Sequence, residues 1–156
     1  MKIYPQKGVD TLRFGMTMEE VRNTWGQPQD IYHFRPLKHN LEDRDVIWEY
    51  GNGTELSFSS SDNFVLGTMT VAALDILLDG KLIIGKSVKE ALLLFPDMEL
   101  DSDFEDLGQD YTLPDRDLTF WVSDECVDSI SLYPDYDVQG RMKVTHVGPE
   151  TPGMNN

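Results

Sequence analysis

Several features that the sequence lacks exclude whole classes of protein. It has a single cysteine, Cys126, so no internal disulfide can form. No apolar run approaches the roughly 18 residues of a membrane-spanning helix. The first residues show neither the apolar stretch of a signal peptide nor an acylation cysteine. We therefore expect a cytoplasmic protein that does not bind membranes, with Cys126 as a small buried apolar side chain.

Groups suited to catalysis or metal binding are also scarce. The three histidines have no HxxxH or HExxH spacing, and there is no cysteine pair to complete a zinc site. The glycine motifs of nucleotide-binding folds and serine hydrolases are missing. An EF-hand starting at Asp101 fails because Asp106 and Thr112 stand where the loop needs glycine and glutamate. We expect a protein that is not an enzyme and holds no cofactor or metal.

Basic residues are few, and the acidic excess is concentrated in one region. The chain has 13 lysines and arginines against 28 aspartates and glutamates, which gives a net charge of −15. Residues 97–137 contain fourteen of these acids and one base, Arg116. Such a field repels nucleic acid and anionic membranes and speeds encounter with a basic protein. A solvated acidic loop that only keeps the protein in solution explains the same composition, and this alternative stays open.

One phrase occurs twice in the chain. Residues 12–21 read LRFGMTMEEV, and 70 positions later residues 82–91 read LIIGKSVKEA. Each copy places a glycine after apolar residues and then a hydroxyl three positions before a glutamate, at Thr17 and Glu20 and at Ser87 and Glu90. That spacing is typical of a capping box at a helix start. Each phrase therefore predicts a strand, a tight turn and a capped helix.

Alternating apolar runs after each expected helix predict three strands. They cover 46–50, 54–59 and a run to Val71 in the first copy, and 111–113, 118–122 and a run to Tyr133 in the second. Phe58 aligns with Phe120 at an offset of 62, so the segment Asp30 to Asp45, with His33 and His39, is expected to be a longer solvated loop. The predicted fold is α+β: two similar helix-plus-three-strand units form one curved antiparallel sheet with helices on one face. We expect a first unit at 1–74, a second at 75–137, and a C-terminal tail at 138–156 with a last strand at Met142 to Val147, all in one compact domain.

Alternation within these strands separates a core face from a second face. Leu56 and Phe58, like Leu118, Phe120 and Val122, are expected in the core with Trp25 and Trp48. The alternate positions then share the other face: Ser57, Ser59, Thr68, Thr70, Thr119, Trp121, Ser129, Ser131 and Tyr133. Small hydroxyls with a few rigid aromatics are typical of a binding surface, although serine and threonine also suit any solvent-facing strand. Trp121 is an expected anchor or a structural side chain, and the sequence leaves both interpretations open.

The residues FGMTMEEV at 14–21 and WGQP at 25–28 carry a family resemblance. They resemble the GMT-x-x-EV … LG-x-P signature shared by the beta-lactamase inhibitor protein family and the small outer-membrane-assembly lipoproteins of the SmpA/OmlA type. The tandem form is similar to the inhibitor family and to small cytoplasmic immunity proteins of bacterial toxin systems. The resemblance implies two units in one curved sheet. It departs from the secreted, disulfide-bonded inhibitors and from the acylated lipoproteins, because this chain has neither feature.

The leading hypothesis is a stoichiometric protein-binding inhibitor, an immunity protein that neutralises a basic, nuclease-type toxin domain. The alternatives are an inhibitor of a secreted hydrolase and a non-catalytic assembly module of the SmpA type. Affinity is expected to come from Trp121 and Tyr133 and the hydroxyls beside them, and fast association from acidic residues. The acids expected at the partner site are Asp101, Asp103, Glu105, Asp106 and Asp110. No direct contact with nucleic acid or membrane is expected, and the sequence does not determine the oligomeric state.

Overall fold

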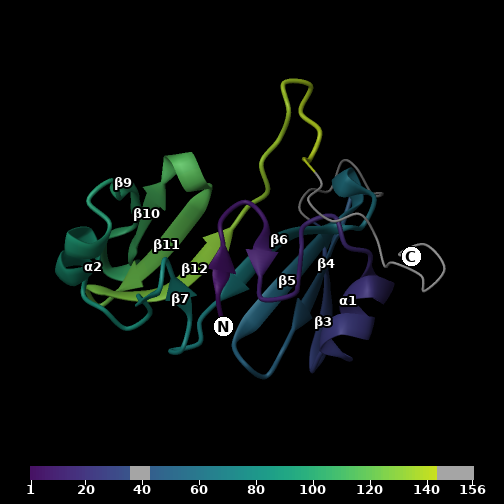
Figure 1. The fold of residues 1–156 in the computed structure, drawn as a ribbon, viewed down its shortest axis with the longest axis horizontal. Helices are drawn as coiled ribbons and strands as arrows, with labels where there is room; N and C mark the ends of the chain where they lie inside the picture. Colours follow the sequence, from purple (N-terminus) through teal and green to yellow (C-terminus); the bar gives the residue numbers. More distant parts are fainter. Residues whose placement is uncertain (36–42, 144–156) are drawn as a thin grey trace.

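The main element of the protein is one eight-stranded antiparallel sheet. The computed structural model describes residues 1–35 and 43–143. The strands lie in the order β3-β4-β5-β6-β12-β11-β10-β9, so β3 and β9 form the two edges (Figure 1). Their bounds are β3 (Asp30–Phe34), β4 (Asp45–Glu49), β5 (Thr54–Ser59), β6 (Leu66–Val71), β9 (Glu99–Asp103), β10 (Gln109–Leu113), β11 (Leu118–Ser123) and β12 (Cys126–Leu132).

In residues 1–35 and 43–143, helical structure is limited to two short α-helices and three single turns. These are α1 (Met18–Trp25), α2 (Val88–Leu94), and the 3₁₀ turns η1 (Ser60–Asp62), η2 (Glu105–Leu107) and η3 (Pro114–Arg116). The two predicted capping boxes are confirmed, since the backbone N–H groups of Glu20 and Glu90 each donate to the hydroxyl of Thr17 or Ser87 at 3.1 Å. Among the described residues, no helix has the length and apolar character needed to cross a membrane.

The predicted fold class is wrong in its proportions and its units. The protein is mostly β, and four strands of the eight-stranded sheet, rather than three, follow each α-helix. The missed strands are β3, which was expected to be a solvated loop containing His33, and β9, which lies in the acidic stretch. All five residues of β3 are exposed, and so are four of the five in β9. Such edge strands bury no face, so they lack the apolar alternation that reveals a strand.

The register also corrects the alignment of the two halves. Each half contains a beta-bulge whose extra residue lies on the partner strand. Gly67 in β6 is opposite the step from Ser57 to Phe58 in β5, and Asp128 in β12 is opposite the step from Trp121 to Val122 in β11. These bulges make Trp121 the counterpart of Ser57, and Leu56 rather than Phe58 the counterpart of Phe120. The true offset in this strand is therefore 64 positions rather than 62. The match of two phenylalanines misled the sequence alignment, because Leu56 fills in the first half the core position that Phe120 fills in the second.

One face of the sheet carries the hydrophobic core. The two α-helices cover its ends, and the hairpins β1 (Ile3–Tyr4) with β2 (Gly8–Val9) and β7 (Leu77–Leu78) with β8 (Lys81–Leu82) lie between them (Figure 1). The largest fully buried side chains are Trp48, Phe14, Phe58, Phe120, Leu12, Leu56, Leu66, Met69, Ile76, Leu78, Ile83 and Leu118. Trp48 is thus in the core as expected, while Trp25 is half-buried against it. Cys126, at the start of β12, is half-buried rather than fully buried.

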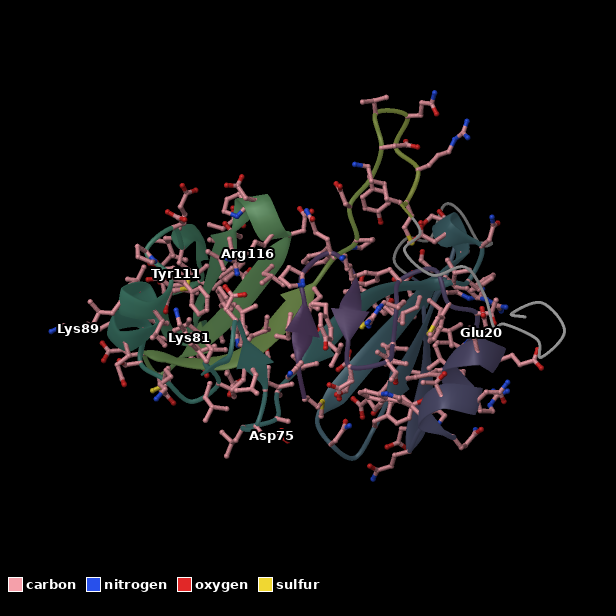
Figure 2. All side chains as sticks on the ribbon, in the orientation of Figure 1. Glu20, Asp75, Lys81, Lys89, Tyr111 and Arg116 are labelled. Carbon is pink, nitrogen blue, oxygen red and sulfur yellow. The ribbon has the colours of Figure 1, made fainter. Side chains whose placement is uncertain are left out.

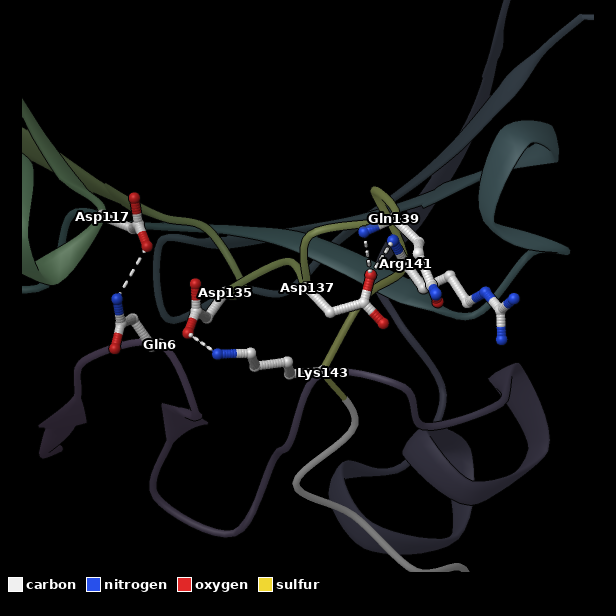
Figure 3. A network of polar contacts seen from close by, with 7 residues as sticks. All are labelled: Gln6, Asp117, Asp135, Asp137, Gln139, Arg141 and Lys143. Atoms are coloured by element: carbon white, nitrogen blue, oxygen red, sulfur yellow. Dashed lines mark hydrogen bonds and ion pairs between the residues drawn. The ribbon is translucent and has the colours of Figure 1, made fainter.

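After β12 the chain leaves the sheet in a loop stabilised by its own polar contacts (Figure 3). A carboxylate oxygen of Asp137 accepts hydrogen bonds from the backbone N–H groups of Gln139 and Arg141, both at 2.9 Å. Lys143 forms an ion pair with Asp135 at 2.9 Å. Of the last strand expected at Met142 to Val147, Met142 makes a single isolated bridge, and residues from 144 onward lie outside the described residues, as does His39.

Candidate functional site: the open face of the sheet

The face of the sheet opposite the core forms the open face, which consists of the alternate side chains of the eight strands. One cross-strand row spans its whole width. From β3 to β9 the row reads Asp30, Glu49, Glu55, Thr70, Ser131, Thr119, Thr112 and Glu99. Hydroxyls occupy its centre and carboxylates its ends. The eight strands contain no lysine or arginine, so this face is anionic.

The centre of the row is the seam where β6 pairs with β12 and the two halves meet. Thr70 and Ser131 are directly opposite each other, and their hydroxyl oxygens lie 2.9 Å apart in a hydrogen bond. Both side chains are half-buried. This confirms the prediction that the two residues share a face. A hydroxyl both donates and accepts, so the seam can redirect its hydrogen bonds toward a bound partner.

Trp121 lies at one end of the open face, directly opposite Asp110 on β10. It is half-buried rather than an exposed anchor, because the chain between β9 and β10 covers part of its ring. A Cβ atom built on Gly108 would lie 2.7 Å from its Cζ2 atom. Phe104 packs against it with ring centroids 6.0 Å apart, and Phe104 itself is 49% exposed. The aromatic surface here therefore consists of Trp121 and Phe104 together, and the sequence analysis identified only Trp121.

Tyr133, the other expected aromatic contact, is 39% exposed just beyond the end of β12. Trp121 pairs with Ser129, which is four residues before Tyr133. At roughly 3.3 Å per residue, this separates the two aromatic positions by about 13 Å along β12. The structure therefore places them as two separate contact points with the hydroxyl centre between them.

The five predicted acids do not form one cluster with equal roles. Asp110 faces the open side and is half-buried; loss of solvation, followed by the charge of Asp101, raises the pKa of its carboxyl. Asp103 instead stabilises the turn after β9, since its carboxylate accepts from the Gln109 amide at 3.1 Å and from a backbone N–H at 2.9 Å. These bonds, the Gln109 bond first, lower the pKa of Asp103. Glu105 and Asp106 are exposed in η2.

The opposite end of the open face contains an acidic group that sequence reasoning missed. Glu49 and Glu55 are directly opposite each other on β4 and β5, with Asp30 beyond Glu49 on β3. The Tyr32 hydroxyl donates to Glu49 at 2.8 Å, and this bond is the main cause that raises the pKa of Tyr32. Burial, followed by the charge of Glu49, raises the pKa of Glu55. Alternation around the core residues of β4 and β5 could have revealed the Glu49–Glu55 pair, but not the tyrosine on β3.

The open face is suited to attracting cations and exchanging hydrogen bonds. Within the residues that the structure describes, no salt bridge involves Glu49, Glu55 or Asp110. In the same part of the chain, no group of three or more histidine, cysteine, aspartate or glutamate side chains is arranged to hold a metal ion. A protein surface with lysines and arginines would supply the charge that this face lacks.

Comparison with known proteins gives little further information. No family model matches the sequence, and no curated protein matches it. A similar solved structure is that of an extracellular protein containing an SCP domain from Bacillus anthracis, with 13% sequence identity and a TM-score of 0.43. The match covers 90% of this chain and 51% of that protein. A likeness of this size carries no argument about function.

Proposed function

We propose that this chain is a stoichiometric protein-binding inhibitor, an immunity protein whose open face binds and neutralises a basic, nuclease-type toxin domain. The observation that carries the proposal is the cross-strand row, with hydroxyls in its centre and, at both ends, carboxylates that form no salt bridge within the described part of the chain. A nuclease needs a basic surface to hold phosphates, and an anionic face of a rigid sheet competes for that surface.

The geometry divides the roles of the residues. Trp121 with Phe104 and, about 13 Å away, Tyr133 provide rigid apolar contact area at low entropic cost. The hydroxyl centre adapts its hydrogen bonds to the partner. The carboxylates at the two ends of the face attract the partner over a distance set by the ionic strength, so their main effect is on the association rate.

The test is a titration of a nuclease by this chain. The gene of an immunity protein lies beside the gene of its toxin. The enzyme to titrate is therefore the nuclease domain encoded next to the gene of this chain. We expect its activity on plasmid DNA or RNA to fall to zero at one equivalent of the chain. Unchanged activity in the presence of excess chain, or a neighbouring gene that encodes no basic domain, would refute the immunity role.

A matched pair of charge reversals locates the binding surface. Glu55→Arg changes the open face, while Glu19→Arg makes the same change in net charge at an exposed position of α1, away from that face. We expect Glu55→Arg to slow association strongly at low salt and Glu19→Arg to leave it nearly unchanged. Equal effects of the two variants would show that only net charge matters and that the open face is not the site.

The alternative functions are separated by further arms of the same assay. The resemblance to the beta-lactamase inhibitor family makes a beta-lactamase the secreted hydrolase to test. Inhibition of that enzyme without inhibition of the nuclease would assign the chain to the hydrolase-inhibitor class. No effect on either enzyme would leave the SmpA-type assembly module as the remaining alternative.

A further inference from the structure

Among the grooves on the helical side of the sheet, two occupy equivalent positions, one in each half of the molecule. The first-half groove, about 370 Å³ in volume, is lined by Met18, Arg22, Ile31, His33, Arg44, Val46, Trp48 and Phe64. The second-half groove, about 510 Å³, is lined by Ser87, Val88, Lys89, Leu92, Gln109, Tyr111 and Glu125. In Figure 2, Lys89 and Tyr111 mark the second groove beside α2, and Glu20 marks α1 at the other end of the molecule.

The register shows that the two grooves are counterparts. The helix positions correspond at the offset of 70, so Arg22 on α1 matches Leu92 on α2. In the floor, Trp48 pairs with Leu56 as Tyr111 pairs with Phe120. The same groove is therefore built twice, once with an arginine and once with a leucine at the equivalent helix position. Because Leu92 occupies the equivalent position on α2, the fold does not require a positive charge at the position of Arg22.

The first-half groove combines an apolar floor with a cationic rim. Trp48 and Val46 form the buried floor. The guanidinium carbon of Arg22 lies 5.2 Å from the ring centroid of Trp48, and that of Arg44 lies 5.2 Å from the ring centroid of Phe64. Stacking on a ring orients a guanidinium while leaving its N–H donors available at the edge.

The charge of this rim contrasts with the rest of the protein. None of the described residues that line this groove is acidic, although the chain carries a net charge of −15. Among the described residues, the salt bridges join other groups, and Arg22 uses its Nε–H in a 2.9 Å hydrogen bond to the neutral side chain of Gln27. Two oriented guanidiniums and the nearby imidazole of His33 thus surround an apolar space, and the described part of its lining contains no carboxylate.

We propose that the first-half groove binds a small amphipathic anion, whose apolar body lies on Trp48 and whose single carboxylate lies between Arg22 and Arg44. Guanidinium groups hydrogen-bond a carboxylate with good geometry, and the charge complementarity is specific to this groove. A volume of about 370 Å³ is within the range of small-molecule sites. The site is on the helical side of the sheet, so it is independent of binding at the open face.

The test uses octanoate and its neutral analogue octan-1-ol as probes, with isothermal titration calorimetry and the NMR signal of the Trp48 indole N–H as readouts. The double variant Arg22→Leu with Arg44→Gln places in α1 the leucine that α2 already tolerates. Lys89→Gln is the matched control, since it removes a positive charge from the other groove. Retained octan-1-ol binding shows that the groove of the double variant is intact.

We expect octanoate to shift the Trp48 signal in the wild-type protein and in Lys89→Gln with equal affinity. The double variant should bind octanoate about tenfold more weakly, because it loses charge-assisted hydrogen bonds, and octan-1-ol with unchanged affinity. The proposal is overturned if octanoate binds the double variant as tightly as the wild type, if the shifts occur at Tyr111 instead of Trp48, or if millimolar octanoate does not bind. Weaker octan-1-ol binding would call for the single variants, each of which must also lower octanoate affinity.

Discussion

The hydrogen bond between Thr70 and Ser131 joins the two halves of the sheet and should stabilise the folded state measurably. Only three residue pairs connect β6 to β12, and this pair is the middle one. Thr70→Val preserves shape and β propensity but leaves the Ser131 hydroxyl without its partner. Both side chains are half-buried, so water reaches the orphaned group and the cost stays at the lower end of the range, about 1 kcal/mol. Ser131→Ala should cost about the same.

A double-mutant cycle isolates this bond. The double variant loses the bond only once, so we expect it to cost about 1 kcal/mol in all and to reveal a coupling energy of about 1 kcal/mol. Urea unfolding followed by tryptophan fluorescence measures the free energy of unfolding; a change of this size moves the midpoint by roughly 0.5 M. Thr68→Val with Ser57→Ala is the matched control, since these residues are also directly opposite each other. In the control pair, the costs of the two single variants should add up to the cost of the double variant. If the costs of the Thr70 and Ser131 variants also add in this way, the two hydroxyls are not coupled and the reasoning is refuted.

Three further predictions concern the open face. For Glu55, burial and the charge of Glu49 raise the carboxyl pKa above its ordinary 4.5, so the folded state binds more protons and stability falls as the pH rises from about that value. Glu55→Gln should therefore gain about 0.5 kcal/mol at pH 7 and nothing at pH 3 in urea unfolding; an equal gain at both pH values would contradict this cause. Trp121→Ala should cost about 2 kcal/mol and exceed the cost of Phe104→Ala, because the tryptophan is the more buried ring; the reverse order in thermal unfolding would count against the described packing. Gly108→Ala should destabilise by about 2 kcal/mol or more, since its φ is +134° and the new Cβ would meet a backbone oxygen of β11 at 2.4 Å; a neutral result would show that the loop can shift.

Local chemistry made the helix starts predictable. A capping box depends on two residues three positions apart, and both boxes form at Thr17 and Ser87 as the spacing indicates. The division of β5 and β11 into two faces was equally predictable, because one face of each strand is fully buried while the alternate positions are not. Patterns of this kind are decided within a few residues.

The features that the sequence did not reveal depend on distant contacts. Beta-strand β3 has no buried residue, so only its pairing with β4 identifies it. The cover over Trp121 comes from Gly108 and Phe104, which belong to a different segment whose acidic composition suggested a solvated loop. Alternation in β4 and β5 assigns Glu49 and Glu55 to the same face, but only the register of the two strands places them directly opposite each other, and only the pairing of β3 with β4 brings Tyr32 to Glu49. Counting acidic residues along the sequence therefore located the end of the anionic face at β9 and β10. It missed the end formed by Asp30, Glu49 and Glu55.

The difference between the two outer strands has a consequence for self-assembly. Growth of a fibre by edge-to-edge addition would place β3 of one copy against β9 of the next. The exposed side chains of Ile31 and Phe34 make β3 a favourable template for such pairing. Strand β9 carries the carboxylates of Glu99, Asp101 and Asp103, which place negative charge at the contact between the two strands. The carboxylates of β9 therefore disfavour the addition of another strand at this edge of the sheet.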